Sequence, residues 1–190
     1  MPHRLVVIGG GPAGNQAATT AARLGAEVTL IERDIVGGAA HLLDCIPSKA
    51  MIATGGAMDE MRRAASMGLT HVEAGLDFEA LRSRIGGIEL QLERSVRSLL
   101  ESQGVRLVTG TGRVIDHNTV EVTDESGRES RFEADTIVLS TGSRPRIPDW
   151  APIDGTRVLT TRDAYPPPEL PEHLVVVGSG VTGVEFVHMF

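Results

Sequence analysis

Short apolar runs alternate with glycine-rich turns at the start of the chain. Residues 5–8 (LVVI) contain no solvent-facing position, which is typical of a buried strand. Residues 9–14 (GGGPAG) predict a turn, and the alanine-rich residues 15–24 predict a helix. A second apolar run at residues 27–32 (EVTLIE) ends in an acid, Glu32. The pattern therefore predicts a strand, a glycine turn, a helix and a second strand.

The later pattern predicts further α/β structure with one antiparallel insertion. A helix is expected to begin near Ile46, where Pro47 suits a first turn, and to end near Ala65. Asp77 predicts the N-cap of an amphipathic helix that ends near Gly104. The remaining expected elements are a strand at 105–108, an antiparallel meander within 113–132, a strand at 136–139, a proline-rich connection at 145–171 and a strand at 174–177.

The glycine spacing in the first turn points to a dinucleotide. Gly9, Gly11 and Gly14 follow the pattern G-x-G-x-x-G directly after a predicted strand. The first glycine permits a tight turn, the second lets a pyrophosphate approach the backbone, and the third lets the helix pack closely on the strand. The N–H groups at the start of the helix can then meet the phosphates. Glu32 stands at about the spacing expected for an acid that accepts ribose hydroxyls.

The same pattern occurs a second time. Residues 174–177 (LVVV) precede Gly178, Gly180 and Gly183, which form another G-x-G-x-x-G. We therefore expect a dinucleotide-binding domain at residues 1–150, and a linker with the beginning of a second such domain at residues 151–190. A Rossmann unit needs further strands to bury its sheet, so the sequence is expected to be the N-terminal part of a longer enzyme.

Composition excludes several classes of protein. The 190 residues are 41% hydrophobic and 23% charged, which suits one compact domain with part of another. A net charge of −7 and an aromatic content of 3% argue against nucleic-acid binding. No apolar run reaches the ~20 residues of a membrane helix, and no secretory signal precedes the first strand, so we expect a cytoplasmic protein. Cys45 is the only cysteine and Lys49 the only lysine.

One stretch of the sequence resembles a known family. Residues 37–49 (GGAAHLLDCIPSK) resemble the redox loop of the flavin-dependent pyridine nucleotide–disulfide oxidoreductases, which reads G-G-x-C-x-x-x-x-C-x-P-x-K. Ala40 takes the place of the first cysteine, and Cys45 matches the second. Residues 140–145 (STGSRP) resemble the family's A-T-G-S-x-P stretch. The resemblance implies an α/β fold: a Rossmann-like FAD-binding domain with a parallel sheet and an inserted antiparallel meander, followed by the start of a Rossmann-like NAD(P)-binding domain.

The loss of one cysteine changes the activity that the resemblance implies. Thiol–disulfide exchange needs a second sulfur, which Ala40 cannot supply. The sequence is most similar to the disulfide-lacking NAD(P)H quinone reductase branch, which implies hydride transfer from NAD(P)H to FAD and on to a quinone or similar small-molecule acceptor. Two alternatives stay open: a flavin oxidase or peroxidase that cycles Cys45 through sulfenic acid, and a dihydrolipoamide dehydrogenase homologue that acts as an FAD-binding module. The family also implies a homodimer, formed through a C-terminal domain outside this sequence.

The resemblance also implies three catalytic residues. Lys49 is expected to place positive charge near the flavin ring and to pair with Glu185 beside the nicotinamide, and Cys45 is expected near the flavin. A lysine in a first helical turn opposes the helix dipole, which favours a ligand role for Lys49. No metal site is expected. The expected cofactor-binding residues lie in the glycine turns, the loops and the strand ends: Gly9, Gly11, Pro12, Ala13, Gly14, Glu32, Arg33, Gly37, Gly38, Lys49, Gly112, Thr141, Gly142, Ser143, Gly178, Gly180, Val181, Thr182, Gly183 and Glu185.

Overall fold

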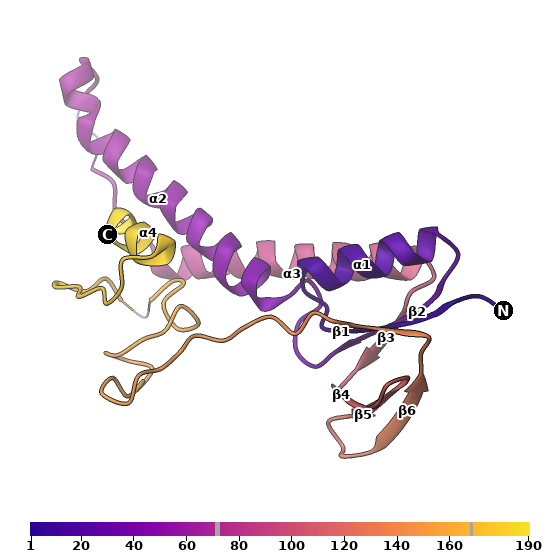
Figure 1. Cartoon of the computed structure of the whole chain (residues 1–190). Helices are drawn as coiled ribbons and strands as arrows, with labels where there is room; N and C mark the ends of the chain where they lie inside the picture. Colours follow the sequence, from indigo (N-terminus) through magenta and orange to yellow (C-terminus); the bar gives the residue numbers. More distant parts are fainter. Residues whose placement is uncertain (71–72, 168) are drawn as a thin grey trace. The chain divides into compact units, whose positions relative to one another are not determined.

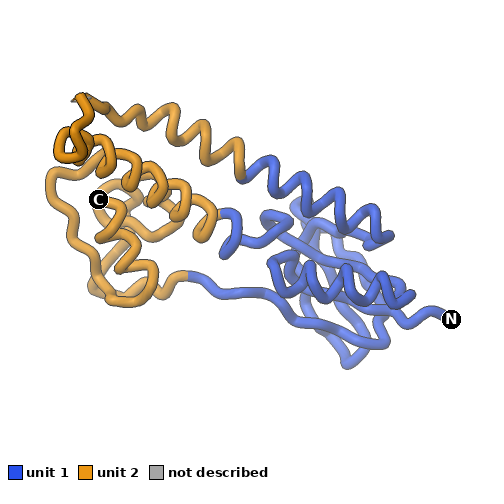
Figure 2. Tube along the Cα trace, turned by 90° about the horizontal axis from the view of Figure 1, so that it is seen from above, with its two compact units in different colours: residues 1–42, 89–144 blue, residues 43–88, 145–190 orange. Residues whose placement is uncertain are grey.

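The computed structural model describes residues 1–70, 73–167 and 169–190. The chain divides into two compact units (Figure 2). The first unit consists of Met1–Leu42 and Glu89–Arg144, and the second of Leu43–Ile88 and Pro145–Phe190. Each unit is described by itself below. The division of the sequence into domains at residue 150 stays a prediction.

A parallel sheet forms the centre of the first unit. Its strands are β1 (Arg4–Ile8), β2 (Glu27–Glu32), β3 (Arg106–Thr109) and β7 (Thr136–Leu139). They lie in the order β3-β2-β1-β7, and every neighbouring pair is parallel. Continuous apolar runs are typical of strands that are covered on both faces, and the predicted strands at 5–8, 27–32, 105–108 and 136–139 are confirmed within one residue at each end.

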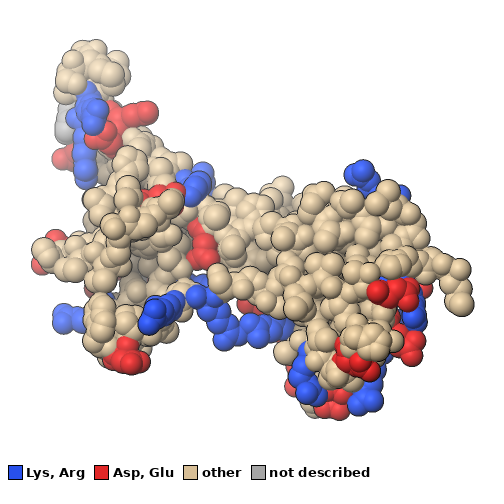
Figure 3. Space-filling model, in the orientation of Figure 1, with Lys and Arg blue, Asp and Glu red and all other residues tan. Residues whose placement is uncertain are grey.

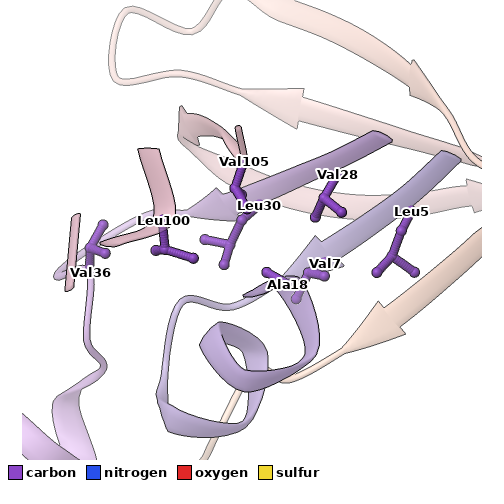
Figure 4. Close-up of a cluster of buried hydrophobic side chains, with 8 residues drawn as sticks. All are labelled: Leu5, Val7, Ala18, Val28, Leu30, Val36, Leu100 and Val105. Carbon is purple, nitrogen blue, oxygen red and sulfur yellow. The ribbon is translucent and has the colours of Figure 1, made fainter. Parts of the chain in front are cut away.

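The two faces of this sheet bury alternate residues of each strand. Helix α1 (Pro12–Arg23) and the end of α3 (Phe78–Ser102) cover one face, where Leu5, Val7 and Leu30 pack with Ala18 and Leu100 (Figure 4). On the other face, Val6, Ile8 and Ile31 pack against Val120 and Val122 of the meander. The predicted antiparallel meander is confirmed, and it consists of β4 (Thr111–Asp116), β5 (Thr119–Thr123) and β6 (Glu129–Glu133) (Figure 1).

The outer face of the meander carries both signs of charge (Figure 3). Glu121 lies 2.5 Å from Arg113 and 3.1 Å from Arg131, and its side chain is only 6% exposed. The hydrogen bond from Arg113 holds the pKa of the Glu121 carboxyl below its usual value. This face is therefore an internally paired surface, and it explains why the strands read as alternating apolar and polar residues.

Helices make up the regular structure of the second unit. Helix α2 (Ile46–Arg63) begins where the sequence predicts a helix and is extended by the short helix η2 (Ala64–Met67). Asp77 caps α3 as predicted, because its Oδ1 accepts hydrogen bonds from the N–H groups of Glu79 and Ala80. The last helix is α4 (Val181–Met189). No helix in the described part of the chain is both long and apolar enough to cross a membrane.

One expectation for the second unit is wrong, and another can be checked only for its described residues. The predicted strand at residues 174–177 does not form, and Val175 and Val177 are 72% and 73% exposed. A strand needs a neighbouring strand for its backbone hydrogen bonds, and none of the described strands runs beside this segment. The predicted connection at 145–171 contains no helix or strand in its described residues, and Pro168 lies outside them.

Candidate functional site

The first glycine turn joins β1 to α1 through close backbone contacts. Gly9 has φ +108°, a conformation that side chains disfavour, and a Cβ there would collide with the carbonyl oxygen of Ser140. A Cβ on Gly14 would collide in the same way with the carbonyl oxygen of Gly9. The first and third glycines of the motif are therefore required by the packing of the turn itself.

The start of α1 is open to an anion. Its N-cap residue, Gly11, has extended backbone (φ −74°, ψ −178°), and the cap makes no side-chain hydrogen bond. The first turn contains no acidic residue, and its N–H groups have no acceptor within the helix. Pro12 and Ala13 are exposed beside this opening. The residues present therefore fit the phosphates of a dinucleotide.

Glu32 is fixed at the end of β2 by two backbone N–H groups. Its Oε2 accepts a hydrogen bond from Gly10 at 2.6 Å, and its Oε1 accepts one from Asp34 at 2.8 Å. A carboxylate has further lone pairs, so both oxygens can still accept ribose hydroxyls. A shallow hollow beside Glu32 is lined by residues at the ends of β2 and β3, including Leu107 and Thr109.

The loop after β2 lies directly against the glycine turn. The N–H of Gly37 donates to the carbonyl of Gly10 at 2.8 Å, and a Cβ on Gly38 would collide with the Cα of Gly11. Both loop glycines have positive φ. The predicted ligand Arg33 is exposed at the start of this loop. The structure thus brings the first glycine motif, Glu32 and the loop glycines together.

The remaining predicted cofactor residues of the first unit lie at two other places. Thr141, Gly142 and Ser143 are exposed directly after β7. Gly112 lies in β4, where a Cβ would come within 3.1 Å of Ile8 and 3.3 Å of Ile31. Gly112 therefore has a packing reason to be glycine, and its expected contact with a cofactor stays a prediction.

The second glycine turn repeats the geometry of the first. Gly178 has φ +118°, and a Cβ on Gly183 would collide with the carbonyl oxygen of Gly178. Gly180 is the N-cap of α4 with φ −72° and ψ 178°, again without a side-chain hydrogen bond. Val181 and Thr182 are exposed in the first turn of α4. This turn is therefore formed, although the strand expected before it is not.

Lys49 and Glu185 form an ion pair inside the second unit. The Lys49 Nζ lies 2.5 Å from the Glu185 Oε1, and the two side chains are 57% and 21% exposed. The Lys49 Nζ also lies 3.4 Å from the Ser48 Oγ. The pair joins α2 to α4, two helices whose positions in the sequence are more than a hundred residues apart. The partnership that the resemblance implied is present in the structure.

The structure corrects the helix-dipole argument for Lys49. A π-helical segment, η1 (Ala40–Cys45), precedes α2 without a break, because Cys45 has helical backbone angles (φ −67°, ψ −44°). Lys49 therefore lies inside a longer helical segment and not at an open N-terminal turn. The sequence analysis did not predict η1, because Pro47 is typical of the first turn of a helix and so placed the start near Ile46.

The loop at residues 37–49 contains one thiol and no second thiol. Cys45 is a free, exposed cysteine, and its carbonyl accepts a hydrogen bond from the Ser48 hydroxyl at 3.0 Å. Ala40, at the position of the first cysteine, lies at the beginning of η1. Within these 190 residues, Cys45 has no second cysteine with which to form a disulfide.

The two glycine turns, the loop at residues 37–49 and the lysine–glutamate pair agree with a comparison with known proteins. A model of the family described as "Pyridine nucleotide-disulphide oxidoreductase" matches residues 3–190. The chain belongs to this family. Its fold is accordingly Rossmann-like, with a parallel sheet and an antiparallel meander, followed by the first turn and helix of a second Rossmann-like unit.

Several family members are similar along nearly all of this chain. An NAD(P)H dehydrogenase (quinone) of Mycobacterium tuberculosis is 40% identical over 100% of this chain and 41% of its own length. A dihydrolipoyl dehydrogenase of Haloarcula marismortui is 38% identical over 98% of this chain and 40% of its own length. The crystal structure of LpdA from Mycobacterium tuberculosis superposes with a TM-score of 0.87 at 39% identity, covering 97% of this chain and 41% of LpdA. The chain thus spans about two fifths of these relatives.

Two residues near the ion pair escaped the sequence analysis. Tyr165 stacks on Phe186 with ring centroids 5.0 Å apart. Gly55 lies against α4, where a Cβ would come within 3.1 Å of the carbonyl oxygen of Met189. Tyr165 is the only tyrosine of the chain, which is a signal that the sequence offers, whereas a glycine such as Gly55 within a predicted helix indicates only a lower helix propensity.

Proposed function

We propose that this chain is part of an FAD-dependent oxidoreductase that transfers a hydride from NAD(P)H to FAD and passes the electrons to a quinone or similar diffusible acceptor, without a redox-active disulfide. The observation that carries the proposal is the Lys49–Glu185 pair, at 2.5 Å, in which Lys49 ends a stretch (residues 37–49) that contains one cysteine where the family's redox loop has two. The name of the 40% identical relative, NAD(P)H dehydrogenase (quinone), supports the same acceptor class.

The proposed FAD site uses the residues that surround the first glycine turn. Gly11 and the start of α1 would hold the pyrophosphate, Glu32 would accept the ribose hydroxyls, and Gly38 would leave the backbone of Gly11 accessible. Bound FAD supplies the redox chemistry, because its ring accepts a hydride and returns two electrons. The protein contributes binding, orientation and charge.

The proposed role of Lys49 is electrostatic. A fixed positive charge beside the flavin ring favours the reduced, negatively charged form, and removal of such a stabilising group costs on the order of 3 kcal/mol in a transition state. An exposed ion pair with only a structural role is worth under about 1 kcal/mol. The two roles therefore differ enough to be separated by measurement. Glu185 holds the lysine side chain in one direction.

Steady-state oxidation of NAD(P)H by the FAD-loaded protein tests the proposal. Menadione should be reduced, whereas lipoamide and glutathione disulfide should not, because Ala40 cannot resolve a mixed disulfide. The Cys45→Ala variant serves as the matched control and should retain menadione reduction. Efficient turnover of lipoamide, or failure of menadione with FAD bound, would contradict the proposal.

A second candidate function is favoured by the exposure of Cys45. An exposed thiol without a resolving partner can be oxidised to sulfenic acid and reduced again, as in a flavin-dependent peroxidase. The same control variant separates this candidate from the first. Peroxide-dependent NAD(P)H oxidation that disappears in Cys45→Ala would favour the second candidate.

A further inference from the structure

We propose that Tyr165 is a positioning residue for the Lys49–Glu185 pair. Its ring stacks on Phe186 and fixes the direction in which the neighbouring Glu185 leaves α4. The contact lies wholly within the second unit. That the pair then serves flavin reduction rests on the proposed function, whereas the positioning itself does not.

The stack is well placed to control the rotation of α4. The rings of Tyr165 and Phe186 have centroids 5.0 Å apart and are inclined by 24°. Successive side chains on a helix point about 100° apart, because 3.6 residues make a turn. Anchoring Phe186 therefore sets the direction of Glu185, whose carboxylate reaches the Lys49 ammonium on α2. Loss of the stack removes the contact that holds α4 beside Glu185 and lets the carboxylate move away from the lysine.

Tyr165 can act as an anchor because its own position is fixed. Its ring packs on a buried cluster formed by α2 and α3, and its neighbours Pro166 and Pro167 are buried. The guanidinium of Arg82 donates a hydrogen bond to the carbonyl of Pro167 at 3.1 Å. The residues of that buried cluster are Ala50, Met51, Leu81 and Ile85.

The charges around Tyr165 agree with this placement. Burial, and then the nearby negative charge of Glu185, raise the pKa of Tyr165 to about 12. Asp44 and Cys45 add to the effect. The phenol thus stays neutral at physiological pH, and Glu185 lies close enough to influence it.

A second contact holds the other end of α4. Gly55 of α2 lies against the backbone of Met189, where an added Cβ would stand 3.1 Å from the carbonyl oxygen. Met189 also packs on the cluster that supports Tyr165. Helix α4 is therefore held near Glu185 by Tyr165 and near its end by Gly55. The glycine that weakens α2 as a helix permits this approach.

The test uses the fact that Lys49 is the only lysine of the chain. Acetic anhydride labels free amines, and peptide mass spectrometry separates Lys49 from the N-terminal amine. In the intact protein, the pair with Glu185 protects the Lys49 amine. Tyr165→Leu should raise the Lys49 labelling rate about two- to threefold, which is the size of effect that an exposed ion pair supports. Tyr165→Phe keeps the ring and should label at the wild-type rate.

A double-mutant cycle shows whether Tyr165 acts through Glu185. Glu185→Gln alone should raise labelling by a similar factor, and Tyr165→Leu should add nothing in that background. Phe186→Leu removes the stack from the other side and should reproduce Tyr165→Leu, which keeps the test decisive if one variant folds poorly. Unchanged labelling in both Leu variants, or equal loss of protection in Tyr165→Phe, overturns the proposal.

Flavin reduction provides a separate readout. If Tyr165→Leu raises labelling while NAD(P)H bleaches the flavin at the wild-type rate, the positioning role stands and the proposed function of the pair fails. If bleaching slows together with the rise in labelling, both stand.

The labelling cycle has its own contradicting outcome. Additive effects of Tyr165→Leu and Glu185→Gln on labelling would show that Tyr165 does not act through Glu185.

Discussion

The two glycine turns of this chain have nearly the same backbone and very different surroundings. Gly11 and Gly180 are both extended N-cap residues, with φ −74° and −72°. In each turn the third glycine lies against the carbonyl of the first. The first turn follows a strand in a four-stranded sheet, whereas the second follows an exposed segment that forms no strand.

The difference separates what is local from what depends on tertiary contacts. The turn and the helix start depend on glycine at the first and third positions of the motif, and therefore form in both settings. The strand depends on partners: β1 has β2 on one side and β7 on the other, and residues 174–177 have neither counterpart among the described strands. An apolar run thus forms a strand only where a neighbouring strand of a sheet is present to accept and donate its backbone hydrogen bonds.

The largest expected effect is a difference in the free energy of unfolding between equivalent variants of the two turns. Gly14→Ala forces a Cβ into the carbonyl of Gly9 within a packed sheet, and should destabilise the protein by about 3 kcal/mol and abolish FAD retention. Gly183→Ala creates the equivalent collision in a turn with little packed around it, so it should cost under about 1 kcal/mol. Urea unfolding followed by circular dichroism measures both. Equal losses in the two variants would show that the surroundings do not matter.

The second turn should matter to activity through Glu185 on its helix. Lys49→Met removes the partner of Glu185 and should slow flavin bleaching by NAD(P)H about a hundredfold while FAD stays bound, since such electrostatic groups are worth about 3 kcal/mol. Stopped-flow absorbance measures the rate. Lys49→Arg retains the charge and is the matched control, with a smaller loss expected. An unchanged rate in Lys49→Met would make the pair an ordinary surface contact.

The retention of FAD at the first turn should depend on Glu32. Glu32→Ala removes the acceptor of the Gly10 and Asp34 N–H groups together with the proposed ribose contact. Hydrogen bonds to charged groups are worth about 1.5–3 kcal/mol, so FAD should dissociate about tenfold more readily. Equilibrium dialysis measures retention. Asp34→Ala alters the neighbouring residue, whose backbone N–H is retained, and should leave FAD retention near wild type.

The smallest expected effect concerns the pH dependence of the first unit. Hydrogen bonds from Arg4 lower the pKa of Asp135 to about 2. Because the folded pKa lies below the unfolded value of about 3.9, this stabilisation is complete above about pH 4 and is lost as the pH falls toward 2. Asp135→Asn should flatten the fall of the urea midpoint over that range. The same slope in wild type and variant would assign the acid sensitivity to other carboxyls.

Much of the first unit was predictable from the sequence because its signals are local or periodic. The buried strands and the glycine turn follow from residue type and spacing alone, as does the Asp77 cap in the second unit. The meander followed from alternation between turn residues. The segment η1 (Ala40–Cys45), where the sequence passes from the first unit to the second, was missed because Pro47 marks a helix start and gives no sign of the π-helical residues before it.

The candidate site was predictable only in part. The open helix start at Gly11 follows from the glycine motif. The Lys49–Glu185 partnership followed from resemblance to a family, since no local signal joins residues so far apart. Tyr165 and Gly55 lie outside every motif and emerge only from the packing of α4. Contacts between distant segments depend on tertiary structure, which is why these two residues could not be found in advance.

A reductive titration of the FAD-loaded protein tests the central claim most directly. Dithionite is added without oxygen, and the flavin spectrum reports when reduction is complete. A flavin takes up two electrons and a redox-active disulfide two more, so an enzyme without the disulfide should need about two electrons per FAD. An uptake of about four electrons per FAD, with Cys45→Ala returning it to about two, would show that a disulfide takes part and would contradict the account.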